Sequence, residues 1–333
     1  MRFGIFQSAQ WPEGTEQHVR LRDAVAQSVL ADELGYDSVF MTEHHFSRHG
    51  IVPDNLSMLS FIAAQTKQIR LGTAVSVLPL HDPIRLAESV ALVDQLSNGR
   101  VEFGIGRGYQ WGEFDGFGQS LADREARFDE AISVILQAWK SSEPFNHEGS
   151  YWEYRNIQPQ PQAIQKPHPP IWMATASSDG FDLCAKNGWG VMLPQAVPIE
   201  TVALWVTDYK TALDRYGKPF DPNKLILARG LHLGDDDASA WAEAGVAYEN
   251  FLALAQRVAE SPGGNASPMP FDLDSVRGNT MICGTETCIE KLQAIRALGI
   301  EHVIFFSNMG GLSHPLVMES LKRFATTVMP ELR

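Results

Sequence analysis

The sequence predicts a (β/α)8 barrel, that is, a TIM barrel with insertions, and three observations support this fold class. Short runs rich in β-branched and aromatic residues alternate with amphipathic helical runs along nearly the whole chain. Such strand–helix units require parallel strands, because each helix carries the chain back across the sheet. Eight units in 333 residues fit a closed barrel better than an open doubly wound sheet, which is the alternative.

The predicted strands are short, and longer helices are predicted between them. The strands are Phe3–Gln7, Ser38–Met41, Arg70–Val77, Val101–Ile105, Ile171–Ala174, Gly190–Leu193, Leu225–Leu231 and His302–Ser307. The clearest helices are Thr15–Leu34, Pro83–Leu96, Arg124–Trp139 and Asp236–Val258. Together these elements predict a single barrel domain over residues 1–333.

Two segments interrupt the alternation. Residues 142–170 are rich in proline, glutamine and aromatic side chains, which predicts a β-hairpin and an extended arm between the fourth helix and the fifth strand. Residues 261–279 show no periodic pattern, which is unusual inside a compact domain and favours a mobile lid loop. A surface insertion without a role at the site is the alternative for this second segment.

The composition is that of an ordinary globular protein, with 44% apolar and 20% charged residues. A net charge of −13 and the lack of any Lys/Arg-rich run argue against a nucleic-acid partner. No apolar run reaches membrane-spanning length, and the first residues are strand-like rather than a secretory signal. Three cysteines, Cys184, Cys283 and Cys288, suggest neither a disulfide framework nor a metal site. We therefore expect a cytoplasmic protein without a metal.

An acid and two imidazoles, Glu43, His44 and His45, follow the apolar strand Ser38–Met41. Active sites of barrels lie at this edge, where the strands end. Neighbours in extended backbone point to opposite sides, so the two histidines should not share a cavity, which argues against a metal pair. We predict His44 and Glu43 as catalytic residues, with one histidine handling a proton and the other hydrogen-bonded at the wall. A pair of structural histidines is the alternative.

Two strand ends favour an anion such as phosphate. The run Gly104–Tyr109 lacks the third glycine of a dinucleotide fingerprint, but its glycines allow close approach of a ligand and Arg107 can grip a phosphate. The run Ala174–Gly180 offers hydroxyls and backbone N–H groups at the start of a helix. Ordinary N-capping by Ser177 or Ser178 is the alternative there. Asp179 would repel a phosphate, so we expect it to face outward.

Small and aromatic residues add a weaker signal. The run Thr73–Ser76 puts small side chains at a strand end, where a flat ring could lie against the backbone. Trp11, Trp111 and Phe114 lie in loops that could form the apolar walls of the barrel mouth, or could belong to the core.

From Phe40 to about Gly118 the chain resembles the α subunit of bacterial luciferase and the wider family of luciferase-like flavin monooxygenases. The similar stretches are Met41–Phe46, Leu71–Ala74, Leu96–Arg100 and Phe103–Gly108. The resemblance implies a barrel that takes up reduced FMN from a separate flavin reductase. Oxygen then adds at the flavin C4a position, and the resulting peroxide oxygenates a small organic substrate.

The resemblance also implies roles for individual residues. His44 matches the catalytic histidine of the family, and Arg107 matches an arginine at the flavin phosphate. Ala74 and Val75 match a pair joined by a non-prolyl cis peptide beneath the isoalloxazine. The full set of implied cofactor-binding residues is Thr73, Ala74, Val75, Arg107, Tyr109, Thr175, Ala176, Ser177 and Ser178.

This chain departs from luciferase at three matched positions: Gly106 replaces a reactive cysteine, and Ala176 and Asp179 replace Ser and Thr. We therefore expect a monooxygenase rather than a true luciferase. An F420-dependent oxidoreductase of the same superfamily and a non-catalytic flavin-binding subunit are the alternatives. The resemblance also implies a homodimer through helices at Leu56–Lys67 and Pro83–Leu96.

Overall fold

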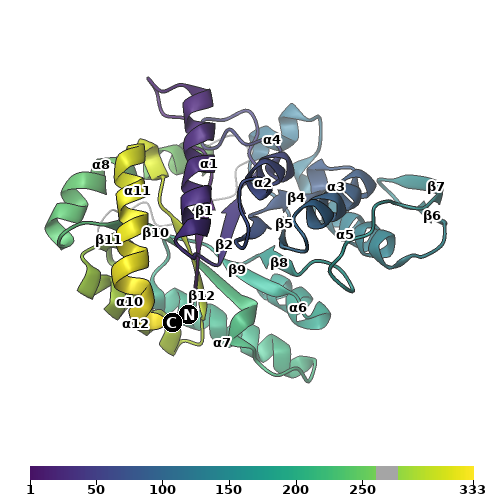
Figure 1. Ribbon diagram of the computed structural model, residues 1–333. Helices are drawn as coiled ribbons and strands as arrows, with labels where there is room; N and C mark the ends of the chain where they lie inside the picture. The colour runs from purple at the N-terminus through teal and green to yellow at the C-terminus, as the bar shows by residue number, and fades with distance from the viewer. Residues whose placement is uncertain (260–276) are drawn as a thin grey trace.

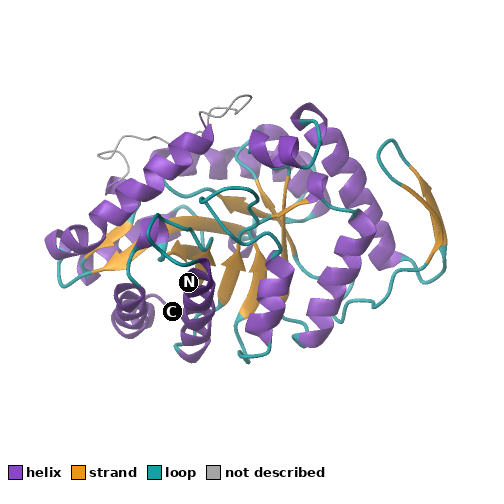
Figure 2. Ribbon diagram, turned by 90° about the horizontal axis from the view of Figure 1, so that it is seen from above, coloured by secondary structure: helices purple, strands orange, loops and turns teal. Residues whose placement is uncertain are grey.

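Eight parallel strands close into a barrel within residues 1–259 and 277–333, which the computed structural model describes (Figures 1 and 2). The barrel strands are β1 (Arg2–Gln7), β2 (Ser38–Met41), β3 (Arg70–Thr73), β5 (Val101–Gly106), β8 (Ile171–Ala174), β9 (Gly190–Leu193), β10 (Leu225–Leu233) and β12 (His302–Phe306). Each pairs with the next in this order, and β12 pairs with both β10 and β1, which closes the ring. The predicted fold class is therefore confirmed, and the open sheet is excluded.

Two strands differ from the prediction. The third predicted strand breaks into β3 and β4 (Ser76–Val77), and the Ala74–Val75 peptide bond between them is cis, as the resemblance implied. A strand that was not predicted, β11 (Met281–Cys283), pairs with the last residues of β10 beyond the barrel. The prediction missed β11 because three residues are too few to show a period.

Helices surround the strands, as Figure 2 shows from above. They are α1 (Gln17–Glu33), α2 (Asn55–Ala63), α3 (Pro83–Leu96), α4 (Trp111–Gly116), α5 (Arg124–Lys140), α6 (Ser178–Asn187), α7 (Ile199–Arg215), α8 (Asp237–Ala259), α10 (Thr285–Ala297), α11 (His314–Arg323) and α12 (Met329–Leu332). The start of α3 follows from its sequence, because Asp82 accepts a hydrogen bond from the Arg85 N–H at 2.9 Å and Pro83 occupies the first helical position. None of the described helices combines the length and apolar character that crossing a bilayer requires.

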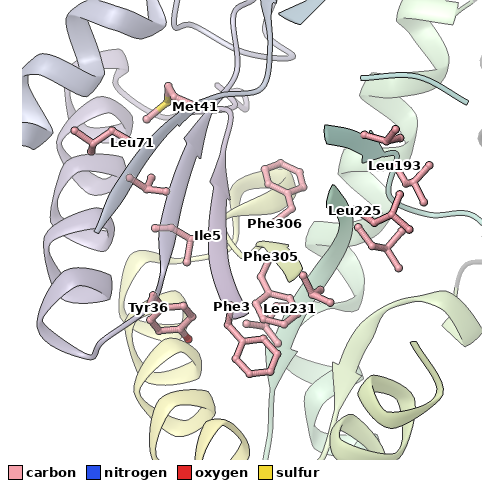
Figure 3. Close-up of a cluster of buried hydrophobic side chains, with 14 of the residues drawn as sticks. Phe3, Ile5, Tyr36, Met41, Leu71, Leu193, Leu225, Leu231, Phe305 and Phe306 are labelled. Carbon is pink, nitrogen blue, oxygen red and sulfur yellow. The ribbon is translucent and has the colours of Figure 1, made fainter. Parts of the chain in front are cut away.

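Side chains alternate along the barrel strands between an outer and an inner layer. Phe3 and Phe305 point outward and pack with Phe324. Figure 3 shows Phe3 next to Phe305. The inner layer contains Phe40, Trp172, Met192, Ile226, Ala228 and Ile304. Gly72 admits the ring of Phe40, since a Cβ there would lie 2.1 Å from it. The barrel is thus filled by side chains beneath the ends of its strands.

The two insertions have different outcomes. The predicted hairpin is confirmed as β6 (Phe145–Glu148) and β7 (Glu153–Ile157), which extend from the edge of the barrel (Figure 1). Glu130 of α5 holds the hairpin turn by accepting backbone hydrogen bonds, including one from Trp152 N at 2.9 Å. The predicted lid at 261–279 lies outside the described residues except for 277–279, which are helical.

Candidate functional site

A cavity of about 510 Å³ lies at the carboxyl ends of the barrel strands. The predicted site residues that line it are Glu43, His44, Ala74, Val75, Arg107, Tyr109, Thr175, Ala176 and Ser177. Thr73 lies behind this wall, where its hydroxyl donates to the Gly104 carbonyl at 2.6 Å. Ser178 is the first residue of α6. One cavity therefore joins segments that follow β2, β3, β5 and β8.

His44 is held through one ring nitrogen. Its Nδ1 lies 3.0 Å from Glu113 Oε1 and 2.8 Å from the side-chain amide nitrogen of Gln110. Glu113 is in the first turn of α4 and also accepts a hydrogen bond from the His45 backbone N–H at 3.1 Å. Since Nδ1 is engaged, Nε2 is the ring nitrogen left for proton transfer. Sequence reasoning missed Glu113 and Gln110, although the acid at the start of a short helix was a signal that could have been used.

Glu43 is 2% exposed and its carboxylate is fully engaged. Oε1 accepts from His45 Nε2 at 3.1 Å, and Oε2 accepts from His81 Nε2 at 2.8 Å and from Val77 N at 3.2 Å. Burial opposes ionisation, but the charge of His81 and the hydrogen bonds of both imidazoles lower the pKa of Glu43 to about 2. Glu43 thus stays ionised and ties the end of β2 to β4. These contacts fit a positioning residue; a catalytic role for Glu43 remains a prediction.

The two adjacent histidines do face different sides, as predicted. His44 lines the cavity, whereas His45 turns to Glu43 and packs edge-on against Phe117 at 4.8 Å. Within the described chain no group of three or more His, Cys, Asp or Glu side chains is arranged to hold a metal ion.

The side of the cavity next to His44 is apolar and aromatic, and we call it the aromatic end. It comprises Phe6, Ser8, Thr42, His49, Phe251 and Phe306. The His49 ring lies 4.9 Å from the His44 ring, and burial together with the nearby His44 lowers the pKa of His49 to about 3. His49 is therefore a neutral imidazole at physiological pH. Sequence reasoning missed it, because a lone histidine in a loop carries no pattern.

The other side, which we call the arginine end, comprises Arg107, Thr175, Ser177 and Asp179. Gly106 brings the backbone against Val75, since a Cβ at this glycine would lie 2.4 Å from the valine side chain. Ser177 caps α6 and receives a hydrogen bond from the Gly180 N–H at 3.4 Å, while its own N–H donates to Thr175 Oγ1 at 3.2 Å. The N-capping alternative is thus realised, within a turn that still lines the cavity.

Asp179 is exposed to solvent, as expected, but its carboxylate also pairs with Arg107. Its Oδ2 lies 2.6 Å from Arg107 Nη1, although the side chain remains 60% exposed. Opposite charges across the turn explain this orientation. Burial raises the pKa of Asp179, but hydrogen bonds from Ser177 and Arg107 outweigh it and lower the pKa below its usual value.

The aromatic residues proposed for the barrel mouth take other places. Phe114 is fully buried and packs close to Gly108, so it belongs to the core. Trp11 lies under the guanidinium of Arg48, 3.8 Å from it. The aromatic walls of the cavity come instead from the inward-facing side chains of β1, β12 and α8.

Residues 1–302 match the family model of luciferase-like monooxygenases. The oxygenase component of a flavin-dependent trigonelline monooxygenase from Acinetobacter baylyi is 28% identical, over 99% of this chain and 95% of its own. The alkanal monooxygenase alpha chain of Photobacterium leiognathi is 26% identical, over 97% and 96%. Among solved structures, the monooxygenase RslO1 from Streptomyces bottropensis has a TM-score of 0.90 at 25% identity, with both chains covered completely. The chain therefore belongs to the luciferase-like monooxygenase family.

Proposed function

We propose that this chain is the oxygenase of a two-component monooxygenase, which uses reduced FMN and O2 to oxygenate a small organic substrate. The observation that carries the proposal is a single cavity with His44 held by Glu113 on one side and the arginine end on the other. A proton-handling group and an anion site in one cavity are what such a reaction needs. The bound flavin would supply the oxidising chemistry.

The residues at the arginine end fit the phosphate of FMN. Arg107 offers a guanidinium, and its Nε is buried without a hydrogen-bond partner within the described residues. Thr175 and Ser177 add hydroxyls at the start of α6, where backbone N–H groups favour an anion. Ala74 and Val75 form a wall of small side chains that suits a flat ring. We propose Ala176, Ser178, Tyr109 and Thr73 as further members of this site.

His44 is the proposed proton-transfer residue. Nδ1–H donates to Glu113 Oε1, which fixes the orientation of the ring and leaves Nε2 for exchange with the reacting group. Glu43 positions the loop that carries His44 through its hydrogen bonds with His45 and His81. The apolar wall at the aromatic end excludes water from the same space, which strengthens hydrogen bonds formed there.

Two partners follow from this proposal. A separate flavin reductase would deliver reduced FMN, and a second copy of the chain would cover α2 and α3. Phe61, Leu92 and Leu96 on these helices are 61%, 48% and 66% exposed, which is unusual for large apolar side chains. Light scattering at micromolar concentration should give a dimer, and a monomer would refute this contact. All three cysteines are buried free thiols, which is compatible with the reducing cytoplasm we propose as its location.

The test is anaerobic mixing of the purified chain with reduced FMN, followed by a pulse of oxygen in a stopped-flow instrument. Return of oxidised-flavin absorbance should be much slower than for free reduced FMN, with little release of hydrogen peroxide. Return at the free-flavin rate would count against the proposal. Binding of F420 with hydride transfer would then indicate the F420-dependent alternative, and flavin binding without turnover would indicate a binding subunit.

A further inference from the structure

Three polar atoms at the aromatic end have no hydrogen-bond partner in the described part of the chain. They are Ser8 Oγ, Thr42 Oγ1 and His49 Nδ1. All three residues line the cavity, and each is at least nine-tenths buried. A buried polar atom without a partner is destabilising, so three such atoms in residues that line one cavity point to a partner from outside the chain. The atoms themselves are covered in the structure, so each side chain would turn to reach that partner.

These atoms adjoin a continuous row of rings. The His49 ring lies 4.9 Å from that of His44 and 6.3 Å from that of Phe251, with which it is stacked. Phe251 contacts Phe306 at 5.3 Å, and Phe306 contacts Phe6 at 5.5 Å. All five residues line the cavity. Aromatic pairs prefer stacked or edge-on geometry, so this row favours a flat ring as its ligand.

The aromatic end lies across the barrel from the arginine end. In the closed order β1, β2, β3, β5, β8, β9, β10 and β12, the pair β5–β8 is opposite the pair β12–β1. Arg107 and Thr175 follow the strands of the first pair, whereas Ser8 follows β1 and Phe306 is the last residue of β12. His44 follows β2 and therefore stands between the two ends. Two ligands, one at each end, would therefore meet beside His44.

The charges around the aromatic end argue against an anionic ligand group there. The arginines among the described lining residues are Arg107 and Arg124, which follow β5 or begin α5, whereas Glu43 and Glu113 line the side near His44. Both carboxylates are already engaged by imidazoles or backbone N–H groups, so they do not call for a cation either. Ser8, Thr42 and neutral His49 instead suit an uncharged hydrogen-bonding group.

We propose that the aromatic end binds the substrate as a flat aromatic ring bearing one neutral polar group, such as a ketone, amide or phenol. Ser8, Thr42 and His49 hydrogen-bond that group, and Phe6, Phe251 and Phe306 contact the ring. Naming this ligand as substrate rests on the proposed function, but the binding itself does not.

The test uses the flavin-free protein and three uncharged probes, with dissociation constants measured by calorimetry or saturation-transfer NMR. Acetophenone carries both ring and carbonyl, ethylbenzene lacks the carbonyl, and cyclohexyl methyl ketone lacks the aromatic ring. Acetophenone should bind at least about fivefold more tightly than ethylbenzene or cyclohexyl methyl ketone. This is the factor that one hydrogen bond or one aromatic contact typically contributes to a dissociation constant. Equal binding of all three probes would overturn the proposal.

A matched pair of variants then locates the probe. Thr42→Val and Thr175→Val make the same change at opposite ends of the cavity. Thr42→Val should weaken acetophenone about fivefold and leave the FMN dissociation constant unchanged, and Thr175→Val should do the reverse. If Thr175→Val alone weakened acetophenone, the probe would occupy the arginine end and the assignment would be wrong.

The melting temperature separates a binding role from a structural one. Because the Thr42 hydroxyl has no partner within the described residues, Thr42→Val and Ser8→Ala should melt at the wild-type temperature or above it. A lower melting temperature would mean that the hydroxyls hold the fold, and would overturn the proposal. If FMN failed to bind while acetophenone behaved as expected, the proposed function would fail and this inference would stand.

Discussion

The arginine end and the aromatic end of the cavity differ in charge, exposure and hydrogen bonding. At the arginine end, Arg107 and Asp179 pair at 2.6 Å near solvent, and Ser177 caps a helix. At the aromatic end, His49 is neutral and its Nδ1 lacks a partner within the described chain, as does Thr42 Oγ1. The first is a polar surface built around an ion pair near solvent, and the second is a buried, largely apolar wall.

This difference shows how one cavity can serve two ligands. A charged group binds best where water and a counter-ion make its release reversible, since a fully buried charge is costly to desolvate. A neutral ring binds best where water is excluded. His44 lies between the ends, and its ring is 4.9 Å from that of His49 at the aromatic end. Variants can therefore test binding at each end separately, and can test proton transfer at His44 separately from binding at either end.

The largest effect is expected at the junction of the two ends. His44→Ala should lower substrate oxygenation by roughly a hundredfold or more, as removal of a general acid or base does, with FMN affinity unchanged. The measurement is product formed per reduced FMN consumed. His147→Ala is the matched control, because His147 forms a similar pair with Glu130 at 3.2 Å on the outer hairpin. If His44→Ala formed as much product per reduced FMN as the wild type, His44 would have no part in the reaction.

The next largest effect is expected at the arginine end. Arg107→Ala should raise the dissociation constant for FMN by roughly 10- to 100-fold, because charge-assisted hydrogen bonds contribute about 1.5–3 kcal/mol. Flavin fluorescence measures it directly, without turnover. Arg155→Ala, which removes an arginine paired with Glu153 on the hairpin, is the control. If both variants bound FMN equally well, the anion site would have to be sought elsewhere in the cavity.

Local pattern explains which parts of this molecule were predictable. The alternation of strands and helices sufficed for all eight barrel strands, because each period repeats over several residues. Arg107 and Ser177 were predictable because strand-end glycines and helix N-caps are local signals. His49 and Phe251 were not, because they meet only through the closed barrel, and Glu113 was missed because α4 spans six residues. The ion pair between Asp179 and Arg107 was not predictable, because it joins two different strand ends that the sequence alone does not place.

An effect of another kind, on stability rather than on binding or turnover, is expected at the aromatic end. His49 has a pKa of about 3 in the folded chain against 6.5 as a free side chain. Between these two pH values the unfolded chain binds a proton at His49 that the folded chain does not. Stability contributed by neutral His49 is fully present above pH 6.5 and falls by about 1.4 kcal/mol per pH unit below it. His49→Phe should flatten this part of the curve of unfolding free energy against pH, measured in urea. An unchanged slope would mean that His49 does not titrate as a buried group.

The smallest effect concerns the acid at the arginine end. In the wild type a phosphate must compete with Asp179 for the guanidinium of Arg107, and it also meets the carboxylate charge. Asp179→Asn removes both obstacles and should tighten FMN binding about threefold, since exposed ion pairs contribute about 0.2–1 kcal/mol. The gain should shrink as salt is added, because screening weakens the competing pair. Weaker binding by Asp179→Asn would instead mean that Asp179 holds Arg107 in place for the ligand, so that its charge helps FMN binding through the arginine rather than opposing it.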